Sequence, residues 1–241
     1  MIVVNELNYQ VVHSSRQGPG FALKNISFSL EQGYIMGVLG ENGSGKSSLL
    51  RLLYGMEQPH SGSVVWDGQN ISADICAFRQ ETAYIASDSG FFRYRSLQEN
   101  VELLGYLYDT FDGNSLDRYL VQYGLEEKRN QMYGMLSLGE QRKFQLAFAM
   151  AHQPKLLILD ELTVGLDTGF RTELMEMLQD LVAMGETSVI LATHILRDID
   201  EIIDYIAILQ DGELVLFGDR ESVLEQQGVT ELEQLVLSCS S

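Results

Sequence analysis

The chain has 241 residues, of which 45% are hydrophobic and 21% charged, and its 34 acidic and 16 basic residues give a formal net charge of −18. This composition is typical of a folded α/β domain and excludes a disordered segment. The acidic balance argues against nucleic-acid binding, because that function needs clustered Lys and Arg to displace counterions from phosphates. We therefore expect one large domain with no nucleic-acid partner.

Neither a cysteine-based metal site nor a membrane span is expected. Cys76 and Cys239 lie far apart, with no Cys or His beside them at metal-ligand spacing. The N-terminal segment reaches its first basic residue only at Arg16, so it lacks the charged start of a secretory signal. Every apolar run is shorter than the roughly 18 residues that a membrane span requires. Any contact with a membrane is therefore expected to come through a partner.

The first part of the chain alternates strand and turn patterns. Residues 34–39 form an apolar run of strand length, followed by a glycine-rich loop and a helix with leucines on its inner face. Residues 64–66 and the turn Asp67-Gly68 predict a hairpin. From about residue 88 to 151 strand patterns vanish, and three helices are expected to start at Ser96, Ser115 and Ser137. We therefore predict a core of residues 1–87 and 152–241 with an inserted helical subdomain at 88–151.

The last part of the chain returns to the α/β pattern. Residues 156–159 and 187–192 are expected to be strands buried on both faces of a mostly parallel sheet. Helical spacing predicts helices over residues 168–184, ending before Gly185, and over residues 195–204. The turn Asp211-Gly212 predicts a second hairpin between residues 206–209 and 214–217. The chain should thus combine a parallel sheet, a smaller antiparallel β part and the helical insertion.

A phosphate-binding loop follows the first buried strand. The segment matches G-x-x-x-x-G-K-[ST] at a strand-to-helix junction, where glycines let backbone N–H groups approach phosphate oxygens. Lys46 would neutralise the β- and γ-phosphates, and the Ser47 hydroxyl would hold Mg²⁺. The loop residues that we expect to bind the nucleotide are Gly40, Asn42, Gly43, Ser44, Gly45, Lys46, Ser47 and Ser48.

Two adjacent acids end the strand at residues 156–159. Because successive residues on an extended chain face opposite ways, Asp160 would face the Mg²⁺ and Glu161 an attacking water. The phosphate loop alone is compatible with kinases, GTPases and transport or mechanochemical ATPases. The acid pair favours nucleotide hydrolysis.

Further motifs stand between and after these two. They are Leu136-Ser137-Leu138-Gly139-Glu140-Gln141, Gly165-Leu166-Asp167 and Thr193-His194. In this order and spacing, over nearly the whole chain, the motifs resemble the ATP-binding subunit of an ABC transporter, a P-loop NTPase. The resemblance identifies the phosphate loop as Walker A, the acid pair as Walker B, and the three later motifs as signature, D-loop and switch histidine.

The resemblance implies a second nucleotide contact. Ser137 opens a helix with a capping box, and its hydroxyl, the following N–H groups and Gly139 form an anion site. In the family this site, with Glu140 in the signature, faces the γ-phosphate bound to the opposite protomer, so that two chains clamp two Mg-ATP. His194 would contact the γ-phosphate and act with Glu161 in catalysis. Asp167 should cap the helix that starts at residue 168.

The chain departs from the family pattern at several positions. Ser87, followed by Asp88, stands where a Mg²⁺-contacting glutamine is usual, and either could take that role. Leu138 and Glu140 replace a glycine and a glutamine of the signature, and Leu162 replaces a common proline. The residue that stacks on adenine, an aromatic in the family, is not assigned. Val11 matches that position of the family pattern, and Tyr9 or Phe21 could take its place. The charge-handling groups remain, which favours an active ATPase.

The segments at residues 106–125 and 193–215 resemble the short ATPases of bacterial exporters for antibiotics and antimicrobial peptides. We therefore expect a cytoplasmic subunit, peripheral on the membrane through a separately encoded permease, that pairs with a second copy of itself or with a related ATPase. Three alternatives stay open: a soluble ABC-type ATPase outside transport, a small-molecule kinase, and a nucleotide-binding regulatory module with little turnover. The cargo and the direction of transport are not encoded in these motifs.

Overall fold

The structure is a computed structural model that describes residues 1–10, 22–86, 90–162, 165–193 and 195–239. Its ten strands form one sheet in the order β5-β4-β1-β2-β10-β9-β3-β8-β7-β6. The strands are β1 (Ile2–Gln10), β2 (Ala22–Leu30), β3 (Ile35–Leu39), β4 (Ser61–Trp66), β5 (Gln69–Asn70), β6 (Thr82–Ile85), β7 (Leu156–Asp160), β8 (Ser188–Ala192), β9 (Tyr205–Gln210) and β10 (Glu213–Asp219).

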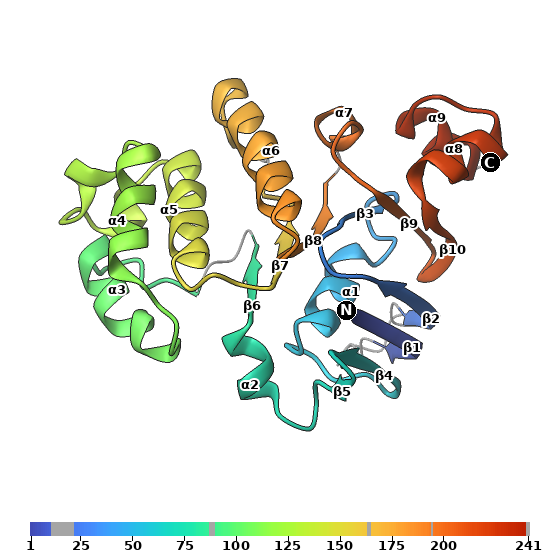
Figure 1. Ribbon diagram of the computed structural model, residues 1–241, viewed down its shortest axis with the longest axis horizontal. Coiled ribbons are helices and arrows are strands. Elements are labelled where there is room, and N and C mark those ends of the chain that lie inside the picture. The colour runs from blue at the N-terminus through green and yellow to red at the C-terminus, as the bar shows by residue number, and fades with distance from the viewer. Residues whose placement is uncertain (11–21, 87–89, 163–164, 194, 240–241) are drawn as a thin grey trace, which may run out of the picture.

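Nine α-helices and three short 3₁₀ turns are found in the described part of the chain. The helices are α1 (Lys46–Leu53), α2 (Ile75–Gln80), α3 (Leu97–Leu104), α4 (Gly113–Gln122), α5 (Leu138–Met150), α6 (Thr168–Ala183), α7 (Leu196–Ile199), α8 (Arg220–Gln227) and α9 (Leu232–Cys239). Figure 1 shows α3, α4 and α5 gathered beyond β6 at one end of the molecule, with α8 and α9 beside β9 and β10 at the other. None of the helices described is long and apolar enough to span a bilayer.

The sheet has a parallel and an antiparallel part, as the sequence predicts. Strands β6, β7, β8, β3 and β9 run parallel to one another, whereas β10 pairs antiparallel with β9, and β1 pairs antiparallel with β2 and β4. Both predicted hairpins form: Asp67 and Gly68 join β4 to β5, and Asp211 and Gly212 join β9 to β10. All four of these turn residues have positive φ, the requirement of a type I′ turn.

The parallel strands are buried on both faces. In β3, Ile35 and Leu39 face one hydrophobic core, whereas Met36 and Val38 face the other. Strands β7 and β8 alternate in the same way, because successive side chains of a strand point to opposite faces. This double burial explains why these segments read as continuous apolar runs. The fold is thus the predicted α/β architecture.

Two helix predictions require correction. Helix α4 starts at Gly113 and is capped by Asp112, because the Asp112 carboxylate accepts hydrogen bonds from the N–H groups of Asn114 and Ser115. Ser115, the predicted cap, lies in the first turn, and its hydroxyl donates to Asp112 at 2.6 Å. By contrast, the capping boxes at Ser96 and Ser137 are both present as predicted.

The helix predicted over residues 195–204 is much shorter, because α7 ends at Ile199. Asp204 explains the early end. Its carboxylate accepts a hydrogen bond from the Ile35 N–H at 2.7 Å, and its own N–H donates to the Ile35 carbonyl at 2.8 Å. These two bonds fix the chain against β3 and direct it into β9.

Candidate nucleotide-binding site

The predicted phosphate loop connects the carboxyl end of β3 to the start of α1. The loop crosses closely over β9, because a Cβ atom at Gly40 would come within 2.2 Å of the Leu209 carbonyl oxygen. Only glycine fits there. Gly45, at φ 111°, is the N-cap of α1 and has no side chain to accept hydrogen bonds from the first turn. The N-terminus of α1 is therefore open to an anion.

Lys46 is the first residue of α1 and is 7% exposed. Its ammonium group donates to the carbonyls of Gly40 at 2.7 Å and Glu41 at 2.9 Å, so it spans the loop from within. Burial lowers the pKa of Lys46, and the carboxylates of Glu161 and Asp160 oppose that shift. The cation thus sits between the loop and the acid pair, where phosphate oxygens would compensate its charge.

The structure brings Ser47 and Asp160 together at the carboxyl ends of two parallel strands, β3 and β7, which have β8 between them. The Ser47 hydroxyl donates to Oδ1 of Asp160 at 2.9 Å, and the Tyr84 hydroxyl donates to Oδ2 at 3.0 Å. No group of three or more His, Cys, Asp or Glu side chains suited to a metal occurs in the described part of the chain. A hydroxyl and one carboxylate nevertheless fit Mg²⁺, which usually takes one or two protein oxygens and completes its shell with phosphates and water.

Glu161 does not continue the strand as predicted. β7 ends at Asp160, and Glu161 adopts φ 53°, a left-handed conformation that costs energy for a residue with a side chain. Its N–H donates to the Ala192 carbonyl at 2.9 Å, which fixes the turn against β8. The direction of the Glu161 side chain is therefore set by this turn, and not by the alternation of an extended chain.

The signature segment starts α5. The Glu140 carboxylate accepts hydrogen bonds from the N–H of Ser137 at 2.8 Å and from its hydroxyl at 2.9 Å, and forms an ion pair with Lys128. The Lys128 ammonium, followed by the Ser137 bonds, lowers the pKa of Glu140. An ionised carboxylate thus lies at the very helix end that the sequence assigns to phosphate.

The signature packs against the D-loop of the same chain. A Cβ atom at Gly139 would lie 3.1 Å from the Gly165 carbonyl oxygen, and one at Gly165 would lie 2.5 Å from Leu138. Asp167 caps α6 as predicted, accepting from the Phe170 N–H at 2.9 Å. These contacts place the signature beside the D-loop at the start of α6.

Several expected site residues lie outside the described part of the chain: His194, Ser87, Asp88, Val11 and Phe21. Tyr9 is described. Its ring packs against His60 with centroids 5.9 Å apart, and a hydrogen bond to Glu57 raises the pKa of Tyr9. Its hydroxyl is therefore engaged within the chain.

Two residues near the acid pair escaped the sequence analysis. Tyr84 lies on β6 and carries no motif. Arg142 lies on α5, is 2% exposed, and donates to the Ala86 carbonyl and to Gln145 at 3.0 Å. Arg142 thus ties the signature helix to the segment just before Ser87. A charged residue on the inward face of a helix was the signal that could have revealed it.

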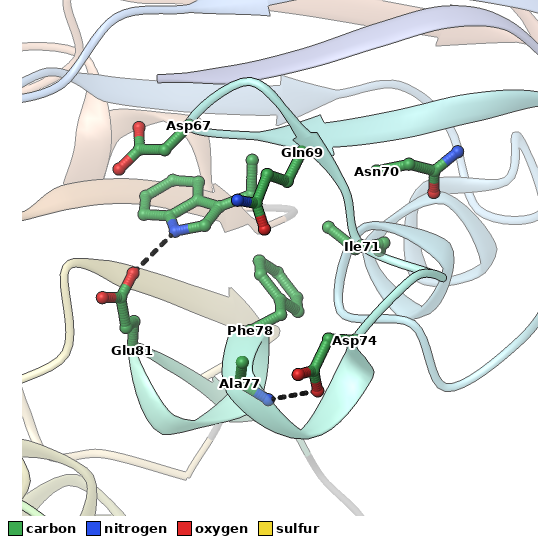
Figure 2. A pocket seen from close by; sticks show the side chains of 9 residues that line it. Asp67, Gln69, Asn70, Ile71, Asp74, Ala77, Phe78 and Glu81 are labelled. Atoms are coloured by element: carbon green, nitrogen blue, oxygen red, sulfur yellow. Dashed lines mark hydrogen bonds between the residues drawn. The ribbon is translucent and has the colours of Figure 1, made fainter.

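The hollows that lie away from the phosphate loop include one beside β6 and one beside β4. A groove of about 320 Å³ between β6, α3 and α5 is lined by Tyr54, Tyr84, Leu107, Tyr108, Phe148 and His152, among others. A second hollow of about 270 Å³ lies between β4, β5 and α2. Figure 2 shows its acids: Asp74 caps α2, and Glu81 accepts from the Trp66 indole at 3.0 Å. Asp67 pairs with the N-terminal amine. The carboxylates that line the second hollow are thus already engaged within the chain.

A phosphate loop and a buried strand acid at the carboxyl edge of a parallel sheet define a P-loop nucleotide-binding protein. A family model described as ABC transporter matches residues 23–164. The chain is 30% identical over 230 residues to the methionine import ATP-binding protein MetN of Protochlamydia amoebophila, covering 92% of this chain and 67% of MetN. It is 29% identical to the linearmycin resistance ATP-binding protein LnrL of Bacillus subtilis, covering 90% of this chain and 70% of LnrL.

A solved structure of an ATP-binding subunit of an ABC transporter has the same fold, with a TM-score of 0.88 and 23% sequence identity over 100% of this chain and 99% of the other. The curated relatives that the chain matches are longer, and it spans about 60% to 70% of their length. The chain belongs to the ABC transporter family. It is an ATP-binding subunit of that family and an ATPase.

Proposed function

We propose that two copies of this chain, or this chain and a related ATPase, close around two Mg-ATP and use their hydrolysis to drive an ABC exporter. The observation that carries the proposal is the junction of Ser47 with Asp160, which joins the phosphate loop to the strand acid. When bound, Mg²⁺ would supply charge neutralisation at the phosphate oxygens. All other steps belong to the side chains described above.

Within one chain each residue has a separate role. Lys46 and the loop amides bind the phosphates, with Gly40, Asn42, Gly43, Ser44, Gly45 and Ser48 forming the rest of the loop. Ser47 and Asp160 would hold the metal. The Glu161 carboxylate opposes the lowering of the Lys46 pKa that burial causes, so Glu161 acts on the same cation that would bind the phosphates. We assign Glu161 to orient and deprotonate the attacking water, and His194 to the γ-phosphate.

A second chain would supply the missing anion contact. In the described residues, Ser137 and Glu140 bond to each other and Glu140 to Lys128, and neither side chain bonds to the phosphate loop. The N-terminal end of α5 is thus suited to bind an anion. Within the described chain, the anionic group that is bonded there is the Glu140 carboxylate. We propose that Ser137, Gly139 and Glu140 face the nucleotide of the opposite subunit.

The groove beside β6 is the surface that we assign to the permease. Its walls join the core, residues 1–87 and 152–241, to the helical subdomain at 88–151, so a partner seated there would contact both. Leu107 and Met56, which line the groove, are 61% and 51% exposed, and Tyr106, which precedes Leu107, is 91% exposed. An exposed apolar cluster around a groove is typical of a binding surface. The chain would then lie on the cytoplasmic face of the membrane.

Export of an antibiotic, peptide or similar small cargo is our proposal for the direction. The segments at 106–125 and 193–215 support it by their resemblance to exporter ATPases, and so does the name of LnrL, whereas MetN is named for import. Transport into or out of inverted vesicles that contain the permease measures the direction directly.

Phosphate release tests the ATPase reaction. The wild-type chain with Mg-ATP should release phosphate, Lys46→Ala should bind little nucleotide, and Glu161→Gln should bind ATP yet turn it over slowly. Transfer of phosphate to a small acceptor would instead identify a kinase. Binding without release by the wild-type chain would identify a regulatory module.

A further inference from the structure

We propose that Tyr84 is a positioning residue for Asp160, and that its hydroxyl holds this carboxylate in the orientation that a metal ion requires. The inference rests on the proposed ATPase function, because it concerns the same metal site. It adds a residue that lies outside every motif from which that function was argued.

Tyr84 reaches Asp160 from the neighbouring strand. On β6, Tyr84 pairs with Ile158 of β7, two residues before Asp160. Its hydroxyl donates to Oδ2 of Asp160 at 3.0 Å, whereas Oδ1 accepts from Ser47 at 2.9 Å. Each carboxylate oxygen is therefore bonded to a different donor. A carboxylate held at both oxygens is restricted to one orientation, with Oδ1 directed at the Ser47 hydroxyl.

The phenol is itself held in place. Its ring stacks on Tyr54 with centroids 5.4 Å apart and planes 24° from parallel. The Arg51 cation lies near the Tyr84 hydroxyl, and a nearby cation strengthens that hydroxyl as a donor.

Packing alone does not require this hydroxyl. Phenylalanine would fill the same space and stack equally on Tyr54. A hydroxyl that is taken out of water costs free energy unless it is bonded, and Asp160 provides that bond. Outer groups that orient a metal ligand commonly contribute 10- to 100-fold to metal affinity. Tyr84 also lines the groove, so a partner seated there would contact the ring that orients Asp160.

The test compares nucleotide affinity with and without metal. Binding of the fluorescent nucleotide MANT-ATP is titrated in Mg²⁺ and in EDTA for the wild type and for Tyr84→Phe. We expect the gain in affinity that Mg²⁺ gives to fall about tenfold in Tyr84→Phe. The affinity in EDTA should not change, because the phosphate loop is intact. Tyr123→Phe is the matched control: Tyr123 is 6% exposed, its hydroxyl contacts Met177 at 3.0 Å, and its loss should change neither affinity.

The results distinguish a failure of the role of Tyr84 from a failure of the proposed function. A wild-type Mg²⁺ gain in Tyr84→Phe, or an equal loss in Mg²⁺ and in EDTA, would overturn the role of Tyr84. Asp160→Asn serves as the reference for the metal site itself, and a normal Mg²⁺ gain in that variant would overturn the proposed function. If Tyr84→Phe does not fold, Tyr84→Met fills the space without a donor and is judged by the same two affinities.

Discussion

Ser47 and Asp160 are 113 residues apart in the chain, yet the Ser47 hydroxyl lies 2.9 Å from Oδ1 of Asp160. The distance is short because β3 and β7 end at the same edge of the parallel sheet, with β8 between them. The phosphate loop and the strand acid therefore meet without any rearrangement of the described chain.

Asp160→Asn tests this junction. Asparagine keeps an oxygen for the Ser47 hydroxyl but loses the charge that attracts a divalent cation. We expect phosphate release to fall at least about 100-fold at saturating Mg-ATP, since a metal contributes several kcal/mol to the transition state. The steady-state rate of phosphate release over a range of Mg²⁺ concentrations measures this fall. Asp180→Asn makes the same change on the exposed face of α6 and should keep wild-type release, and an equal loss in both variants would contradict the assignment.

Glu140→Gln tests whether α5 receives a phosphate. Glutamine keeps the capping box, because its side-chain oxygen can accept from the Ser137 N–H. It removes a negative charge from the proposed anion site. We expect the nucleotide-dependent dimer to form about two- to fivefold more tightly at low salt, with the difference shrinking as salt rises. Sedimentation velocity at two salt concentrations measures the dimer affinity.

The exposed Glu127 provides the control for Glu140. Glu127→Gln removes the same charge from the helical subdomain without touching α5, and it should leave the dimer affinity unchanged. Equal strengthening by both variants would show that general charge repulsion, and not the site at Ser137, governs association.

Because His152 is buried, we expect the free energy of unfolding to depend on pH. It is 1% exposed, stacks on Tyr108 with ring centroids 4.1 Å apart, and burial lowers its pKa to about 4 from an ordinary value of 6.5. Below pH 6.5 the unfolded chain takes up a proton that the folded chain does not, so acid favours unfolding. Between pH 7 and pH 5.5 this effect should cost about 1 kcal/mol.

Urea unfolding followed by the fluorescence of Trp66, the single tryptophan, measures that cost. His152→Phe keeps a ring against Tyr108 and cannot take up the proton. We expect its free energy of unfolding to fall about 1 kcal/mol less than that of the wild type over the same pH interval. Parallel losses in the two proteins would show that other groups are responsible.

Much of this fold was readable from local patterns. The buried strands read as apolar runs because both faces of the sheet are covered, and the turns Asp67-Gly68 and Asp211-Gly212 require the positive φ that these residues tolerate. The end of the helix near residue 195 was not readable, because Asp204 bonds to Ile35 across the sheet. The cap of α4 was misassigned because Asp112 and Ser115 both suit a cap, and only the backbone geometry separates them.

The residues of the candidate site also divide into those that local sequence patterns predict and those that they do not. Lys46, Ser47 and Asp160 were found because their spacing along the chain carries the chemistry. Tyr84 and Arg142 act through contacts with distant segments, and no local spacing marks them. The turn at Glu161 likewise depends on the hydrogen bond to Ala192 on the neighbouring strand.

The central claim is that two chains close around two Mg-ATP. The most direct measurement is the solution mass of Glu161→Gln by light scattering after size exclusion, with and without Mg-ATP, beside the double variant Lys46→Ala/Glu161→Gln. Turnover should be about 10²- to 10⁴-fold slower without the general base, so ATP stays bound during the run. The account predicts that Mg-ATP doubles the mass from the 27.1 kDa of one chain for Glu161→Gln and not for the double variant. A Glu161→Gln chain that binds Mg-ATP and keeps the mass of one chain would contradict closure by two copies of this chain, and would require a related ATPase or the membrane partner to complete the site.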